Sequence, residues 1–104
     1  MNFYLTRKAK SDLKAIARYT QKQWGVDQRN TYLKQIDQAF HDLAKSPDQG
    51  RNCDHIRPGY RKYKVGRHYI FYRDTSSDGV IQEDVEIVRI LHERMDITNR
   101  LRED

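Results

Sequence analysis

The sequence predicts an α+β fold in which an antiparallel helical hairpin packs on a small, mostly antiparallel, twisted sheet. Apolar residues recur every three or four positions through residues 7–45, which is the helical period. After a segment with Pro, Gly, Asn and Asp at 46–58, aromatic and β-branched residues follow a period of two. A length of 104 residues suits one domain, spanning 1–104.

The chain is expected to begin with a short strand, Asn2–Leu5, because this stretch is aromatic and apolar. Thr6 then offers a side-chain oxygen for a helix N-cap. The spacing predicts a first helix from Arg7 to Trp24, and Gly25 suits the position just past its end.

A second helix is expected to follow almost at once, with Asp27 as its N-cap and its end before Ser46 and Pro47. Two helices joined by so short a link should pack as an antiparallel hairpin. Its apolar stripe consists of Leu33, Ile36, Phe40 and Leu43.

Two strands, Tyr60–Val65 and His68–Arg73, are expected to form a β-hairpin around Gly66 and Arg67, which suit a type II′ turn. This register gives two sides. The core-like side pairs Val65 with His68, Tyr63 with Ile70 and Arg61 with Tyr72. The more exposed side pairs Lys64 with Tyr69, Lys62 with Phe71 and Tyr60 with Arg73. Phe71 is too apolar for an exposed side, so a bulge or a second apolar contact is expected there.

The C-terminal part predicts a turn over Asp74–Gly79 and a strand beginning at Val80. The later part of this strand, Val85–Leu91, is apolar enough for the middle of a sheet. Asp96–Arg102 is expected to form a short terminal helix.

The chain has 20 Lys and Arg against 15 Asp and Glu, a formal net charge of +5, which favours anionic partners. A domain of this size has little interior to enclose a small-molecule substrate. The N-terminal residues lack the apolar stretch of a signal peptide, and no apolar run is long enough to span a membrane, so a cytoplasmic location is expected. Cys53 and the His residues lack zinc-ligand spacing, and no phosphate-binding Gly-rich loop is present. We therefore expect no metal and no cofactor.

Basic and aromatic residues alternate between Arg51 and Arg73, as required for phosphate contact and base stacking on a sheet. A solvated basic face, or one that binds an acidic protein, explains the pattern equally well. His92 follows the apolar strand, where it is either a general base for RNA cleavage or an ordinary hydrogen-bonded His.

The order of elements, together with four stretches of sequence, resembles the RelE/ParE toxin superfamily of bacterial toxin–antitoxin systems, and in particular its ParE branch. The resemblance covers essentially the whole chain, and the last two stretches are the specific ones. The stretches are Asp12–Gly25; Tyr32-Leu33 with Phe40 and Leu43-Ala44; Val65–Arg73; and Val85–Asp96.

The resemblance implies a toxin that traps DNA gyrase on cleaved DNA and blocks replication, without catalytic residues of its own. It also implies a cognate ParD-like antitoxin whose tail wraps the toxin, with operator DNA bound through the antitoxin. The residues expected to face gyrase are Arg61, Arg67, Arg73, Arg89, His92 and Arg94. The residues expected to bind the antitoxin, in a groove along the helices and the basic sheet, are Lys62, Lys64, Tyr69, Leu13, Ile36 and Phe40.

Two alternatives remain at this point. A RelE-like, ribosome-dependent mRNA endonuclease shares the fold, and its candidate catalytic residues here are His92, Arg67 and Arg73. Glu93, however, places a negative charge beside His92, which disfavours a phosphate there. The second alternative is an inactive homologue that only binds antitoxin for autoregulation.

Overall fold

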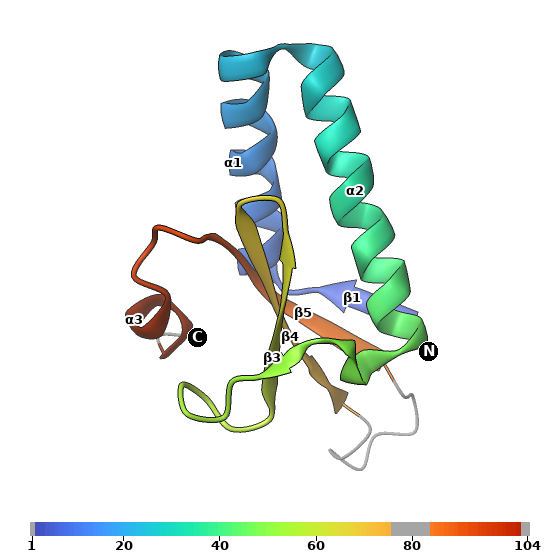
Figure 1. Cartoon of the computed structure of the whole chain (residues 1–104), viewed down its shortest axis with the longest axis vertical. Helices are drawn as coiled ribbons and strands as arrows, with labels where there is room; N and C mark the ends of the chain where they lie inside the picture. Colours follow the sequence, from blue (N-terminus) through green and yellow to red (C-terminus); the bar gives the residue numbers. More distant parts are fainter. Residues whose placement is uncertain (1, 76–83, 103–104) are drawn as a thin grey trace.

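The computed structural model describes residues 2–75 and 84–102 and confirms the predicted α+β fold (Figure 1). The sheet has the strand order β1-β5-β4-β3-β2, with β1 parallel to β5 and the other neighbours antiparallel. The elements are β1 (Asn2–Leu5), α1 (Arg7–Trp24), α2 (Val26–Lys45), the 3₁₀ helix η1 (Pro47–Gln49), β2 (Arg51–Asn52), β3 (Tyr60–Val65), β4 (His68–Asp74), β5 (Asp84–His92) and α3 (Ile97–Arg102).

The helical hairpin begins and turns through local backbone chemistry. Thr6 caps α1 as predicted, its Oγ1 accepting a hydrogen bond from the backbone N–H of Ala9 at 3.1 Å. Gly25, with φ of 92°, is the single residue between α1 and α2. The prediction that Asp27 caps α2 is wrong, because Gly25 occupies that position. Asp27 lies in the first turn instead, where its negative charge still favours the helix N-terminus.

One face of the sheet packs against α1 and α2. Ile36, Phe40 and Leu43 from α2 are buried with Ile70 and Ile87 from the sheet. The two helices extend well beyond the sheet, so the end of the hairpin around Gly25 has no strand beneath it (Figure 1). Apolar side chains at that end are therefore left exposed.

The other face of the sheet is covered around Phe71, although Lys64 on the same face stays exposed, so the expectation that this side is the more exposed one is corrected in part. Phe71 and Leu91 are fully buried there against Leu101 of α3 and Cys53 of the loop before β3. Arg57 fixes this cover by donating to the carbonyl of Leu101 at 3.2 Å. The second apolar contact predicted for Phe71 is thus present, and the pairing with β5 shifts between Phe71 and Tyr72, as a bulge there requires.

The register predicted for the β3–β4 hairpin is confirmed in all six pairs, from Tyr60 with Arg73 to Val65 with His68. β4 continues through Asp74, so the turn predicted over Asp74–Gly79 does not begin at Asp74. The part of that turn after Thr75, and the predicted strand start at Val80, lie outside the described residues.

The segment predicted as a loop contains β2 and η1. Glycine is needed at position 50, because a Cβ there would collide with the Tyr72 hydroxyl. That hydroxyl accepts from the Gly50 N–H and donates to the Pro47 carbonyl. No helix in the described part of the chain combines the length and apolar content that crossing a bilayer requires.

Candidate target-binding cleft

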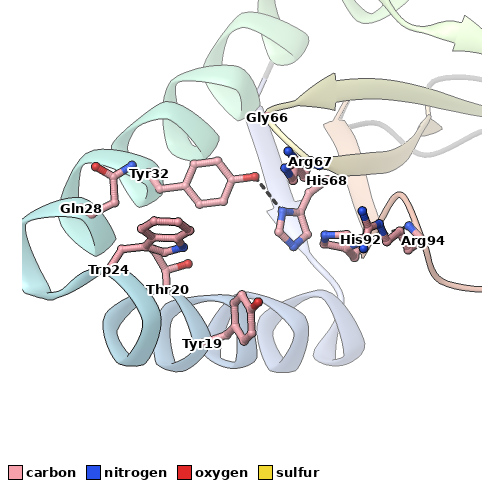
Figure 2. Close-up of a pocket in the computed structure, with 10 residues that line it drawn as sticks. All are labelled: Tyr19, Thr20, Trp24, Gln28, Tyr32, Gly66, Arg67, His68, His92 and Arg94. Atoms are coloured by element: carbon pink, nitrogen blue, oxygen red, sulfur yellow. Dashed lines mark hydrogen bonds between the residues drawn. The ribbon is translucent and has the colours of Figure 1, made fainter.

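An open cleft of about 460 Å³ lies where the exposed end of the helical hairpin meets the β3–β4 turn (Figure 2). We call it the tip cleft. It is lined by Tyr19, Thr20, Trp24, Gln28, Tyr32, Gly66, Arg67, His68, His92 and Arg94. A second open cleft, running along α1 towards Met95, shares Tyr19, His68, His92 and Arg94 with it. The two clefts therefore adjoin.

Tyr32 fastens α2 to the β3–β4 turn. Its hydroxyl donates to the carbonyl of Val65 at 3.0 Å and lies 2.6 Å from Nδ1 of His68 (Figure 2). Because a hydroxyl has one hydrogen, this arrangement requires Nδ1 to donate to the hydroxyl oxygen. Gly66, with φ of 56°, has no room for a side chain, since a Cβ would lie 2.8 Å from the Tyr32 ring.

His68 and His92 face each other across β4 and β5, with ring centroids 5.1 Å apart. Burial, followed by the neighbouring His92, lowers the pKa of His68 from 6.5 to about 4. His68 is therefore neutral at neutral pH. Nδ1 of His92 accepts the backbone N–H of Arg94 at 3.1 Å, which makes it a hydrogen-bonded histidine at a strand end.

Acidification should destabilise the fold through His68. The unfolded chain takes up a proton near pH 6.5 and the folded chain only near pH 4, so stability falls between these values and no further below them. Because His68 is only partly buried, we expect its contribution to the free energy of unfolding to fall by about 2 kcal/mol, less than the full pKa difference would give. Chemical denaturation at pH 7 and pH 4.5 measures it. His68→Gln should remove most of the loss, whereas His41→Gln, at an exposed position of α2, should leave it unchanged; equal behaviour of the two variants would contradict the assignment.

Arg67 and Arg94 bring positive charge to the tip cleft. Glu93 pairs with Lys64 at 3.0 Å and with Arg67 at 3.4 Å. The hydrogen bond from Lys64 lowers the pKa of the Glu93 carboxyl. Arg67 remains 71 % exposed, and Arg94 is exposed without an ion-pair partner among residues 2–75 and 84–102. Both guanidinium groups can therefore reach an anionic partner.

The remaining residues predicted to face a target lie elsewhere. Arg61 donates to the Gly50 carbonyl at 2.9 Å and supports β2. Arg89 is buried, with only 9 % of its surface exposed, and its Nε and Nη2 bind the two carboxylate oxygens of Asp12 at 2.8 and 3.0 Å. Arg89 is thus not available to a partner, and its prediction as a contact residue is wrong. Its charge is used to join α1 to β5.

The three candidate nuclease residues are not brought together. Arg67 and His92 both line the tip cleft, but Arg73 lies opposite Glu86 and pairs with it at 3.0 Å. Glu86 is six residues from His92 on the same strand, a separation of about 20 Å. Arg73 therefore cannot act on a substrate held at His92.

The residues predicted to form one antitoxin groove lie on opposite faces of the sheet. Lys62 and Lys64 place their ammonium groups 5.0 and 5.7 Å from the Tyr69 ring, on the α3 side. Ile36 and Phe40 are at most 2 % exposed on the helical side, and Leu13 packs on that core. The prediction of a single groove is wrong, because the apolar stripe of the helices is buried against the sheet and is not open to a partner.

Sequence reasoning missed four of the residues that shape the tip cleft: Tyr19, Trp24, Tyr32 and His68. Trp24 is the last residue of the helix that the spacing predicts; it is 71 % exposed, and Tyr19 is 62 % exposed. A signal for Trp24 was its place immediately before Gly25, at the very end of the helix. No group of three or more His, Cys, Asp or Glu suited to a metal occurs within the described ranges.

Comparison with known proteins gives one consistent result. Residues 3–97 match the family model for the "ParE toxin of type II toxin-antitoxin system, parDE". Toxin ParE1 of Mycobacterium tuberculosis is 40 % identical over 99 residues, covering 95 % of this chain and 96 % of that protein. Toxin ParE1 of Caulobacter vibrioides is 34 % identical, covering 89 % and 90 %, and Toxin ParE of Escherichia coli is 31 % identical, covering 95 % and 91 %.

The fold agrees as well. A solved structure described as the chromosomal ParDE TA system from P. aeruginosa superposes with a TM-score of 0.70 at 23 % identity, covering 88 % of this chain and 95 % of that one. Because the family model matches almost the whole length of this chain, the chain belongs to the ParE toxin family of type II toxin–antitoxin systems.

Proposed function

We propose that this toxin inhibits DNA gyrase by binding it, so that gyrase is held on cleaved DNA and replication stops. The observation that carries the proposal is the match to the ParE family over residues 3–97. Family resemblance implies the target, and an inhibitor that acts by binding needs a contact surface and no catalytic group. The tip cleft is such a surface.

The side chains at the tip cleft suit a protein target. Trp24 and Tyr19 are exposed aromatic residues on one side, and Arg67 and Arg94 are exposed cations on the other. Trp, Tyr and Arg are the residue types that dominate the binding energy of protein interfaces. The Tyr32–His68 contact holds the floor of the cleft rigid, which limits the entropy cost of binding. We assign Trp24, Arg67, His92 and Arg94 to the contact with gyrase.

The endonuclease alternative finds less support in the geometry. Arg73 lies far from His92 and is engaged by Glu86, while Glu93 sets a negative charge next to His92, the base predicted for this alternative. Of the three residues predicted for RNA cleavage, Arg73 is therefore too far away to act together with Arg67 and His92. A non-enzymatic mode of action requires no such assembly.

Parallel assays with the purified toxin test the proposal. In one, gyrase supercoils relaxed plasmid; in the other, programmed ribosomes carry an mRNA. Loss of supercoiling with intact mRNA is the expected result. Cleaved mRNA with unaffected gyrase would move the function to the nuclease alternative, and no effect in either assay would favour the inactive homologue.

We further propose that a ParD-like antitoxin neutralises the toxin and contacts the basic strand surface formed by Lys62, Lys64 and Tyr69. This surface suits an acidic, disordered tail that orders on binding. The complex would then bind operator DNA through the antitoxin.

The double charge reversal Lys62→Glu with Lys64→Glu should weaken antitoxin binding at least tenfold at low salt, because two attractive charges become repulsive. Titration calorimetry with purified antitoxin measures the effect. Lys34→Glu with Lys45→Glu changes the net charge equally at exposed positions of α2 and serves as the control. Equal losses in the two variants would remove β3 from the proposed contact.

A further inference from the structure

We propose that the outer face of α1 binds the phosphate backbone of duplex DNA. The surface consists of Arg7, Lys10, Lys14, Arg18 and Lys22, which are all exposed, and we call it the basic stripe. The proposal rests on the proposed function in one respect: the DNA in question is the duplex on which gyrase acts. A toxin held at gyrase by the tip cleft would then also hold the DNA.

The stripe follows from helical geometry. Lys10, Lys14, Arg18 and Lys22 are spaced four residues apart, and side chains four apart lie one above another on the same face. The buried residues Ala9 and Ile16 occupy the opposite face, against the sheet. With a rise of 1.5 Å per residue, the row from Lys10 to Lys22 is about 18 Å long. A straight helix presents it as a rigid line of charge.

The stripe carries charge of one sign only. The sole acidic residue of α1 is Asp12, which turns away to bind Arg89. In the part of the chain that the structure describes, none of the five cations has an ion-pair partner. Three successive i,i+4 pairs of like charge oppose helix formation, and no acidic neighbour offsets them. The outer face of α2, in contrast, mixes Asp27, Asp37 and Asp42 with its basic residues. α1 therefore keeps an arrangement that weakens its own helix.

The composition of the stripe favours nucleic acid over a protein partner. Protein interfaces depend on buried aromatic or aliphatic anchors, and the stripe has none, since the side chains that lie among its cations on the helix surface are the polar Ser11 and Gln21. Binding to phosphates needs only positive charge at regular intervals, and it gains free energy from the counterions released. Duplex DNA offers a continuous line of such charges, to which a rigid row can match over several base pairs.

Binding of the toxin alone to a labelled 20-base-pair duplex, measured by fluorescence anisotropy across a series of salt concentrations, tests the proposal. The variant Lys14→Gln with Arg18→Gln should bind more weakly. It should also lower the slope of log K against log salt by about two, because each substitution removes one cation from a phosphate. Lys34→Gln with Lys45→Gln removes the same charge from α2 and should leave the slope nearly unchanged. Gln keeps helix propensity and removes like-charge repulsion, so the melting temperature of the stripe variant should not fall.

Equal slopes for the two variants would overturn the proposal, as would the absence of wild-type binding at 50 mM salt. Loss of antitoxin affinity in the stripe variant with an unchanged DNA slope would also overturn it, because the occupant would then be an acidic protein. No gyrase is present in this assay. Its outcome is therefore separate from the gyrase test: a toxin that binds DNA through α1 but leaves gyrase active would refute the proposed function alone.

Discussion

Replacing Asp12 with alanine is expected to lower the free energy of unfolding by about 3 kcal/mol. The Asp12 carboxylate binds two nitrogens of Arg89 and also accepts the backbone N–H of Ile90 at 3.0 Å. Its removal leaves a guanidinium that is 11 % exposed without its counter-charge, together with a backbone donor that no longer has its acceptor. Urea denaturation monitored by circular dichroism measures the change.

Asp37→Ala is the matched control, since Asp37 makes an exposed i,i+4 pair with His41 on α2. Its effect should stay below about 0.5 kcal/mol. An effect of Asp12→Ala as small as that of the control would show that the pair does not hold α1 on β5. Arg89 would then again be a candidate for target contact.

Replacing Trp24 with alanine should raise the toxin concentration needed to inhibit gyrase at least about 30-fold, which corresponds to a loss of about 2 kcal/mol for an aromatic anchor. The fold should be unaffected, because 71 % of Trp24 is exposed in the free toxin. Supercoiling assays over a range of toxin concentrations measure the shift, and thermal denaturation verifies the fold.

Tyr4→Ala controls for the general loss of an exposed aromatic residue. Tyr4 is 42 % exposed on β1 and donates a hydrogen bond to Glu86, away from the tip cleft. Its inhibition curve should match that of the wild type. If Trp24→Ala inhibits as well as the wild type does, the tip cleft is not the gyrase contact.

The backbone plan was predictable from local signals. The caps and turns at Thr6, Gly25 and Gly66 set the element boundaries, and the two-residue turn at Gly66 fixed the hairpin register. These signals operate within a few residues of the chain, so a sequence displays them directly. The cap assigned to Asp27 failed because one glycine serves both helices.

The burial of the second sheet face could not be predicted in the same way. Phe71 and Leu101 meet although they are 30 positions apart in the sequence, and the periodicity of a strand does not show what will cover it. Arg89 illustrates the same limit. A basic residue in an apolar strand suggests a contact with a partner, but its true partner is Asp12, on a distant helix.

The tip cleft depends on long-range packing as well. Tyr32 and His68 come together only because α2 passes over the β3–β4 turn, and Trp24 is exposed only because the helices are longer than the sheet beneath them (Figure 1). Arg67, His92 and Arg94, which the sequence predicted to face a target, all lie at a strand end or within two residues of one.

Gyrase-mediated cleavage of plasmid DNA, with and without the purified toxin, tests the proposed function most directly. The reaction is stopped with detergent so that DNA held in the cleaved complex is released as linear plasmid. The expected result is linear DNA that accumulates with toxin concentration and disappears when the antitoxin is added first. Unchanged supercoiling and no linear DNA at saturating toxin would contradict the proposal that this ParE family member acts on gyrase.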